Sequence, residues 1–439
     1  MSIGSSKRPI GIDLFAGAGG MTLGFEQAGF DIPVSVELDP IHCATHQFNF
    51  PFCLMLCRSV VDISGNEIRQ LLDIHNQEID VVFGGPPCQG FSTIGKRASD
   101  DPRNTLISHF LRLVLELQPK YFVMENVKGL TVGKHRIFLQ EIIDKFSQNG
   151  YQVQQPYQVL NAANYGVPQN RERLFLLGCQ NDLRLPNYPQ AITSFSQKNY
   201  ARTKVDYNLA NYITVWDAIG DLPAVEKYPE LLERDWVNAE KDYDKPSKYA
   251  RKLRGFENFH NDYSYPREYD WKILTSSLRT RHTLKSVERF LATPPGKVES
   301  VSRFYRLNPD GICNTLRAGT PSSRGAYTSP RPIHPFKPRC ITVREAARLH
   351  SYPDWFRFHV TKWHGFRQVG NSVPPLLAKA VAEEIIQALN IKPFPPRDTK
   401  YKLEEKPENL KINMSIAADL YGVDPHTIAP RTRKEKSQD

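Results

Sequence analysis

Short apolar runs alternate with helix-like segments along the first half of the chain. The runs are short enough to be buried strands, and the segments between them repeat apolar residues at the spacing of one helix face. Strands are predicted at residues 10–15, 33–37, 79–83, 121–124 and 174–178, and helices at 21–28 and 106–117. Because this alternation is typical of parallel βαβ units, we predict an α/β fold with a doubly wound sheet. Ligands bind to such sheets where the strands end.

The pattern changes after about residue 180. Residues 181–340 are rich in Pro, Tyr, Lys and Arg, and the rhythm of strands and helices fades. Later helices are predicted at residues 343–349, 376–389 and 415–421. The C-terminal tail, residues 391–439, is rich in Pro and Lys, so we expect part of it to be disordered. We predict a first domain at 1–180 that residues 365–390 complete, a second domain at 181–364, and a basic tail at 391–439.

Composition indicates a soluble protein with an anionic partner. Among the 439 residues, 57 Lys and Arg stand against 47 Asp and Glu, which gives a net charge of +10. This excess favours nucleic acid as a partner, although it can also serve solubility alone. No apolar run reaches the ~18 residues of a membrane span. The seven cysteines include no CxxC pair, so no zinc site or disulfide framework is predicted, and we expect the protein in a reducing cytoplasm.

A glycine-rich segment, DLFAGAGG, follows the first predicted strand. Gly17, Gly19 and Gly20 allow a tight turn and a close approach of the backbone to a ligand. The segment departs from the dinucleotide fingerprint, because the third glycine would fall at Thr22. Glu37 closes the next predicted strand, where a carboxylate can accept hydrogen bonds from ribose hydroxyls. Together these features indicate a nucleoside cofactor, with a structural turn and a surface glutamate as the alternative.

A single cysteine stands in an unusually stiff setting, GGPPCQGFS. Cys88 could be a buried inert thiol, a metal ligand or a nucleophile. The two prolines fix φ, and the glycines permit close contact with a flat substrate. The next segment is polar and basic, which favours a reactive site under a mobile loop.

Two further motifs place charged side chains at predicted strand ends. Glu125, in ENV, follows an apolar strand, and such a carboxyl could donate a proton, although a surface glutamate is the simpler interpretation. Arg171 and Arg173, in QNRERLF, lie on one side of an extended segment because side chains alternate there. Two guanidinium groups on one face suit a phosphate or a polarised carbonyl, with a salt-bridge network as the alternative.

Taken together, these segments resemble the DNA cytosine-5 methyltransferase family, in particular its bacterial restriction–modification type. DLFAGAGG is similar to the cofactor loop, VELD and VVDIS to the ribose and adenine segments, GGPPCQGFS to the Pro-Cys motif, ENV to the glutamate motif and QNRERLF to the arginine motif. TVWDAIGDLP, RCITVREAARLHSYPDWF and GNSVPPLLAKAVAEEI follow in the family's order. The resemblance implies a Rossmann-like S-adenosylmethionine-dependent methyltransferase sheet with a smaller, irregular target recognition domain.

The resemblance also implies a reaction at a cytosine flipped out of double-stranded DNA. Cys88 would add as a thiolate to C6 of the base, which makes C5 reactive toward a methyl group. Glu125 would donate a proton or a strong hydrogen bond to N3, so it would need a desolvated site. Arg171 and Arg173 would hold the base O2, the phosphate or Glu125 itself, with Arg171 ranked first by its place in the motif.

Binding residues follow from the same resemblance, and no metal is expected. The cofactor S-adenosyl-L-methionine would be bound by Phe15, Gly17, Gly19, Gly20, Glu37, Leu38, Asp62, Ile63, Pro87, Leu106 and Asn371. DNA would be contacted by Gln89, Ser92, Ile94, Lys96, Arg97 and Gln169. Arg317 and Arg324 are further candidates, because the segment 315–335 mixes arginines with glycines and small polar residues, with a solvated basic loop as the alternative. Sequence recognition would lie within about residues 181–340.

The expected role is DNA modification by a monomer in a bacterial cytoplasm, paired in function but not physically with a restriction endonuclease. An RNA cytosine-5 methyltransferase of the same fold and a catalytically inactive DNA-binding homologue are the alternatives. The long recognition region favours double-stranded DNA over RNA. The intact set of Cys88, Glu125 and Arg171 argues against an inactive homologue.

Overall fold

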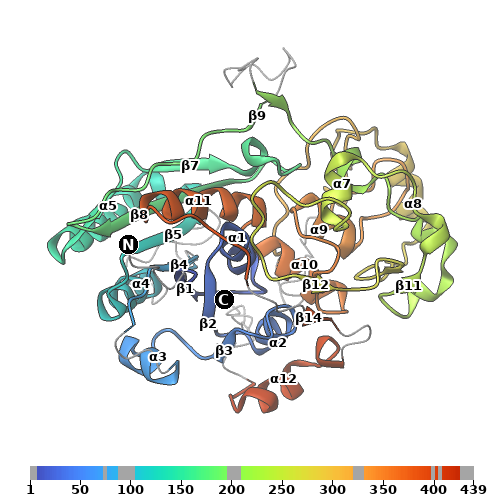
Figure 1. The fold of residues 1–439 in the computed structure, drawn as a ribbon. Helices are drawn as coiled ribbons and strands as arrows, with labels where there is room; N and C mark the ends of the chain where they lie inside the picture. The colour runs from blue at the N-terminus through green and yellow to red at the C-terminus, as the bar shows by residue number, and fades with distance from the viewer. Residues whose placement is uncertain are drawn as a thin grey trace, which may run out of the picture.

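The computed structural model describes residues 7–72, 77–87, 104–194, 209–319, 331–396, 401–403 and 408–425. At its centre is an eight-stranded sheet with helices on both faces (Figure 1). Its strands are β1 Ile10–Leu14, β2 Asp31–Glu37, β3 Leu54–Cys57, β4 Val81–Gly84, β5 Tyr121–Val127, β6 Tyr151–Val153, β7 Gln158–Asn161 and β8 Glu172–Gln180. The order is β3-β2-β1-β4-β5-β8-β6, and β7 also pairs with β8. The expected α/β class is confirmed.

The sheet is mixed. The strands β3, β2, β1, β4 and β5 are parallel, as the alternation of strands and helices predicted. In contrast, β8 runs antiparallel to β5, β6 and β7, so the parallel pairing expected from the alternation of strands and helices does not extend to this side of the sheet. The strands β6, β7 and β8 follow one another without a crossover helix. Short connections join antiparallel strands, whereas a parallel pair needs a longer crossover.

The structure contains the five predicted helices together with others that were not predicted. They are α1 Gly20–Ala28, α2 Pro40–Asn49, α3 Gly65–Leu71, α4 Asn104–Leu117, α5 Lys134–Gln148, α6 Val215–Ile219, α7 Lys248–Leu253, α8 Leu284–Ala292, α9 Val343–Leu349, α10 Lys362–Asn371, α11 Pro375–Ala388 and α12 Met414–Tyr421. The helices predicted at 343–349, 376–389 and 415–421 are α9, α11 and α12, and each is confirmed within one residue. The sequence analysis did not predict α2, α3, α5, α6, α7, α8 and α10. The signal for α2 was present, because Asp39 and Pro40 are a favourable N-cap and first residue for a helix.

Short elements complete the fold. The short strands are β9 Thr193–Ser194, β10 Ala210–Asn211, β11 Val237–Asn238, β12 Arg267–Glu268, β13 Ile273–Leu274 and β14 Tyr401–Lys402. The 3-10 turns are η2 Lys128–Thr131, η3 Ala162–Tyr165, η4 Val225–Lys227, η5 Pro229–Leu232, η6 Glu240–Asp242 and η8 Glu408–Leu410. Most of them lie between β8 and α9, in agreement with the irregular region predicted there.

Two hydrophobic layers cover the sheet. Successive side chains of a strand point to opposite faces. Thus Val81 and Phe83 pack in the layer that holds α1, α9 and α11, whereas Val82 packs in the layer that holds α3, α4 and α5. All three side chains are fully buried, which accounts for the continuous apolar run of β4.

Helices α1 and α11 lie unusually close together. A Cβ added to Gly24 would lie 2.4 Å from the Cβ of Ala378, a distance that real side chains do not reach. The glycine therefore lets α11 pack directly on the helix that follows the glycine-rich loop. This contact brings the loop between α10 and α11 to the end of β1, although some 350 residues separate them in the chain.

The predicted second domain shares the largest core with the first. Val215, Leu253 and Leu307 belong to the same buried cluster as Val343 and the residues of α11. Smaller clusters form around Leu231 and Phe290. The division of the chain at residues 180 and 364 stays a prediction.

Candidate active site

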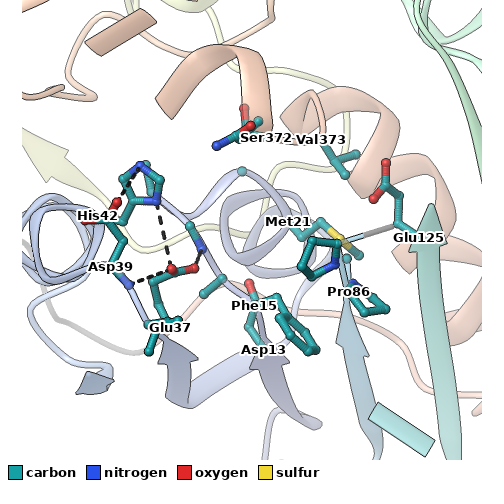
Figure 2. Close-up of a pocket in the computed structure, with 18 of the residues that line it drawn as sticks. Asp13, Phe15, Met21, Glu37, Asp39, His42, Pro86, Glu125, Ser372 and Val373 are labelled. Carbon is teal, nitrogen blue, oxygen red and sulfur yellow. Dashed lines mark hydrogen bonds and ion pairs between the residues drawn. The ribbon is translucent and has the colours of Figure 1, made fainter. Parts of the chain in front are cut away.

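A cavity of about 420 Å³ opens where β1, β2, β4 and β5 end, a volume typical of small-molecule sites. Figure 2 shows Glu37 and Glu125 on opposite sides of it, with Phe15 and Pro86 between them. The predicted residues that line the cavity are Phe15, Gly17, Gly20, Glu37, Leu38, Pro87, Leu106, Glu125, Arg171, Arg173 and Asn371. Residues from the first strand and from the far end of the chain therefore meet in one site.

The glycine-rich loop is bound to the carboxylate of Glu37. Its backbone has positive φ at Phe15 (66°), Gly17 (58°) and Gly19 (101°), a conformation that is costly for phenylalanine and easy for glycine. The N–H of Gly17 donates to Oε2 of Glu37 at 2.8 Å. Oε1 of Glu37 accepts from the N–H of Asp39 at 2.9 Å. The carboxylate is thus oriented from both sides (Figure 2).

Helix α2 and helix α10 meet beside Glu37. Asp39 caps α2 by accepting from the N–H of Ile41 at 3.0 Å, and its other oxygen lies 3.1 Å from Nη1 of Arg367. Burial favours the protonated form of Asp39, but its electrostatic interactions with His42, Arg367 and His364 outweigh burial and lower its pKa. Both His42 and Arg367 line the cavity.

Glu125 occupies the opposite side of the cavity, near the end of β5. Its Oε1 lies 2.9 Å from Nε of Arg173, and the two side chains are 13% and 15% exposed. Burial raises the pKa of Glu125, and the charges of Arg173 and Arg171 oppose that rise without cancelling it. The site therefore holds a carboxyl that keeps its proton to a higher pH than an ordinary glutamic acid.

Gly85 makes room for this carboxyl. A Cβ added there would lie 2.8 Å from Oε2 of Glu125. Gly85, which precedes Pro86 and Pro87, thus lies within contact distance of Glu125 on the neighbouring strand β5. The motifs GGPP and ENV are therefore parts of one site, because β4 and β5 pair in parallel and end at the same edge.

Comparison with known proteins gives the family. The family model for C-5 cytosine-specific DNA methylase matches residues 11–387. The chain belongs to this family. The enzyme class and the resemblance expected from the motifs are thereby confirmed.

Bacterial relatives cover most of this methylase. The type II methyltransferase M.XorII of Xanthomonas oryzae pv. oryzae is 58% identical over 426 residues, which span 97% of this chain and 95% of the relative. The type II methyltransferase M.DdeI of Desulfomicrobium norvegicum is 33% identical over 85% of this chain and 88% of its own length. A crystal structure of a proposed prophage-encoded DNA modification methyltransferase from E. coli superimposes with a TM-score of 0.68 and 34% identity, covering 87% of this chain and all of the other.

The two arginines of the methylase motif have different environments. Arg171 is 1% exposed, and its guanidinium donates to three main-chain carbonyls, those of Leu316 at 2.8 Å, Gly370 at 3.0 Å and Ser372 at 2.8 Å. The guanidinium that contacts Glu125 is that of Arg173. For the contact with Glu125, the ranking of Arg171 before Arg173 is therefore corrected, because the guanidinium of Arg171 is bonded to the main chain. The roles of the two arginines toward the base and the phosphate stay predictions.

Gln169 is another correction. It was expected to contact DNA, but its side chain is fully buried. Its Nε2 donates to the carbonyl of Leu349 at 3.2 Å and lies 2.9 Å from Nδ1 of His350, and its Oε1 accepts from the N–H of Leu316 at 3.0 Å. A buried amide whose groups are bonded within the protein is a packing element, since a DNA contact would require an exposed atom. Arg317, by contrast, is exposed.

Three predicted cofactor residues do not line the cavity. Gly19 caps α1, and a Cβ added there would lie 2.3 Å from the ring of Phe50, on the side of the protein core. Ile63 is 1% exposed and belongs to the layer of α3 and α4. Asp62 is exposed, and its carbonyl accepts from Nη2 of Arg58 at 2.9 Å. The residues of this segment that do line the cavity are Ser59 and Val60, together with Arg58.

Several predicted residues lie outside the part of the chain that the structure describes. They are Cys88, Gln89, Ser92, Ile94, Lys96, Arg97 and Arg324. The described residues immediately before Cys88 are held by Asn126, whose Nδ2 donates to the carbonyl of Pro86 at 3.1 Å. The sequence analysis missed Asn126, although it stands next to Glu125 in the ENV motif.

Asp13 is a second residue that the sequence analysis missed. It is the last residue but one of β1, is 1% exposed and lines the cavity. Its Oδ2 accepts from the hydroxyl of Thr22 at 2.6 Å. Burial raises its pKa to about 8, and Glu37 adds to the rise while Thr22 opposes it. Its position in DLFAGAGG, at the end of a buried strand, was the signal that could have found it.

Within the described ranges, no helix could cross a bilayer and no cluster of His, Cys, Asp and Glu could hold a metal ion.

Proposed function

We propose that this methylase transfers a methyl group from S-adenosyl-L-methionine to C5 of a cytosine in a specific short sequence of double-stranded DNA. The observation that carries the proposal is the buried pair of Glu125 and Arg173, in the same cavity as Glu37. A carboxyl that burial keeps protonated can donate to N3 of a cytosine. An arginine beside it can hold that carboxyl and the neighbouring base oxygen.

The cavity fits S-adenosyl-L-methionine as the methyl donor. A Cβ added to Gly17 would meet no atom within 4 Å, so this glycine leaves cavity space that a side chain would fill. The carboxylate of Glu37 is fixed by two N–H donors and can still accept from ribose hydroxyls through its remaining lone pairs. When bound, the cofactor supplies the electrophilic methyl carbon that C5 attacks.

Cys88 acts as the nucleophile in this proposal. Its thiolate forms the S–C6 bond, and the electron pair of the C5=C6 bond moves through the ring toward N3, which takes a proton from Glu125. C5 is then an enamine carbon and would form its bond to the methyl group while the sulfur–methyl bond of the donor breaks and its electron pair stays on the sulfur. N3 returns its proton to Glu125, a water removes the C5 proton, and the S–C6 bond breaks to restore the C5=C6 bond and the thiolate.

The target base must leave the duplex before these steps. A ring carbon inside the stack cannot be reached by a side chain, and flipping costs a few kcal/mol of stacking and pairing. Asn126 positions the segment of Pro86 and Pro87 that leads to Cys88, because it donates to the Pro86 carbonyl from the strand of Glu125.

The cellular role that we propose is modification of host DNA in a restriction–modification system. The relatives at 58% and 33% identity are type II methyltransferases of bacteria. The enzyme acts as a monomer in the cytoplasm and shares its recognition sequence, but no physical contact, with an endonuclease. One such chain can approach one flipped base, so a second copy is unnecessary for the chemistry.

Bisulphite sequencing tests the proposal. The chain is expressed in a bacterial host without cytosine methylation, beside the variants Cys88→Ser and Glu125→Gln. We expect protected cytosines in one recurring sequence with the parent chain, none with Cys88→Ser and far fewer with Glu125→Gln. Complete conversion despite soluble parent protein would overturn the DNA proposal. Transfer of labelled methyl groups to RNA in the same extract would then indicate the RNA alternative.

A further inference from the structure

The C-terminal segment 408–425 lies beyond the residues that the family model matches, 11–387. It contains η8 and α12, and α12 packs beside α2 and β3 (Figure 1). Leu410, Ala417 and Ala418 are fully buried. A segment that buries such residues is a fixed part of the fold, because exposing them would cost free energy.

One end of this segment covers the back of the Glu37 wall. Tyr421 and Val423 pack on a buried cluster formed by Cys43, Met55 and Cys57. The hydroxyl of Tyr421 also donates to Oε1 of Gln47 in α2 at 2.7 Å. Helix α12 therefore holds α2 against β3.

The cysteines of this cluster contact the main chain of the cavity wall. The thiol of Cys43 donates to the carbonyl of Glu37 at 3.5 Å, and the thiol of Cys57 donates to the carbonyl of Leu38 at 3.8 Å. Both acceptor residues line the cavity. Only one layer of side chains thus separates Tyr421 from the residues that line the site.

The other end of the segment supports the α10 wall. The carbonyl of Leu410 accepts from the N–H of Val360 at 3.0 Å, and the carbonyl of Ile412 lies 2.9 Å from Nε2 of His359. The N–H of His359 donates to Oε1 of Gln368 at 3.0 Å. Gln368 lines the cavity.

The two supported walls are joined inside the site. Nη1 of Arg367 lies 3.1 Å from Oδ2 of Asp39, and Nε2 of Gln368 donates to Oγ1 of Thr45 at 2.8 Å. The first contact is an ion pair in which Asp39 is almost fully buried. Displacing α2 from α10 would break both contacts and would move Asp39, whose N–H donates to Oε1 of Glu37.

We propose that the segment 408–425 is a positioning element of the cofactor cavity. It holds α2 and α10 at the spacing that places the carboxylate of Glu37 for the ribose, and Tyr421 is its main contact with α2 and β3. The proposal rests on the proposed function, because it takes the ligand of this cavity to be S-adenosyl-L-methionine. A group that orients a binding residue affects affinity strongly, although it never touches the ligand.

The test is Tyr421→Ala in the full chain, with S-adenosyl-L-homocysteine as the binding probe in calorimetry. We expect the Kd of the probe and the KM for the methyl donor to rise about tenfold, as on loss of an orienting contact. The kcat at saturation and the KM for DNA should stay near the parent values. Tyr421→Phe keeps the ring over Cys43 and Cys57 and should restore most of the affinity. The control is Leu420→Ala, because Leu420 is the adjacent residue and is 54% exposed.

A merely structural role predicts a different result. The thermal midpoint would fall with Tyr421→Ala, while the Kd measured well below that midpoint would equal the parent value, and this would overturn the proposal. Equal rises of the KM for DNA and for the methyl donor would overturn it as well. If Tyr421→Ala does not fold, Val423→Ala is used, with a smaller rise of Kd expected and no rise as the contrary outcome. Failure of the unaltered chain to bind the probe would instead overturn the proposed function, and this proposal with it.

Discussion

Nε of Arg173 lies 2.9 Å from Oε1 of Glu125, across the pairing between β5 and β8. Two opposite effects act on the carboxyl. Burial raises its pKa, and the guanidinium lowers it, with burial the larger effect. The pair therefore differs from a surface salt bridge, in which the acid is simply ionised. It can present a proton to a substrate while the arginine fixes the direction of the carboxyl.

Replacing Arg173 with alanine should change the pH dependence of methylation. Without the guanidinium, burial acts on Glu125 with less opposition, so its pKa rises further. A proton donor with a higher pKa stays protonated to higher pH. The basic limb of the plot of kcat against pH should therefore shift to higher pH. We also expect kcat to fall about a hundredfold, as on loss of one positioned donor. Arg173→Lys, which keeps a cation, should shift the limb less, and an unmoved limb in Arg173→Ala would contradict the assignment.

Replacing Arg171 should mainly affect stability. Arg171→Met would leave the buried carbonyls of Leu316, Gly370 and Ser372 without this donor. We expect the free energy of unfolding to fall by about 3 kcal/mol or more, since each hydrogen bond to a charged group contributes roughly 1.5–3 kcal/mol. Urea unfolding measures the change. The exposed Arg136 provides a control as Arg136→Met, and similar losses in both variants would contradict the structural role.

A methyl group at Gly85 should disturb Glu125 without unfolding the chain. The Cβ of Gly85→Ala would lie 2.8 Å from Oε2 of Glu125, so the carboxyl must move by a few tenths of an ångström or more. Small displacements of a catalytic group can cost about a hundredfold in rate. The measurement is kcat with the thermal midpoint beside it. In the control Gly129→Ala, the nearest atom would be 4.0 Å away, so activity should be kept.

Asp13 should make stability fall as pH rises. Its pKa is raised from 3.8 to about 8 by burial, so between these values the folded state holds a proton that the unfolded state has lost. Linkage then lowers the free energy of unfolding with rising pH, by up to about 1.4 kcal/mol per pH unit. Asp13→Asn lacks this proton, so its stability relative to the parent should increase from about pH 4 to pH 8. Urea unfolding at pH 5 and pH 8 measures this. An equal difference at both pH values would show that Asp13 does not titrate in this window.

The local elements of the fold could be predicted from the sequence. The apolar run at β4 and the spacing of apolar residues in α9 and α11 identify a strand and two helices, because the period of side-chain burial is set by the backbone itself. The motif residues Glu37 and Glu125 could be placed in one cavity, because the parallel strands that carry them end at one edge of the sheet. Each of these predictions uses only residues that lie close together in the sequence.

The environments of single side chains could not be predicted in this way. Arg171 and Arg173 are equivalent by period, yet one binds three carbonyls and the other binds Glu125. The carbonyls come from residues 316, 370 and 372, so the difference depends on how distant segments pack. The burial of Gln169 has the same origin, since its partners lie in α9, at His350 and at Leu316.

The sequence by itself determined the α/β class, the family and the motifs of the site, because apolar periodicity and motif chemistry are properties of short segments. Only the tertiary structure decided the antiparallel direction of β8, the partner of each arginine and the contact of α12 with the wall of Glu37. A strand accepts either direction of neighbour, and a charged side chain accepts any partner of suitable geometry within reach. Packing between segments far apart in the chain selects among them.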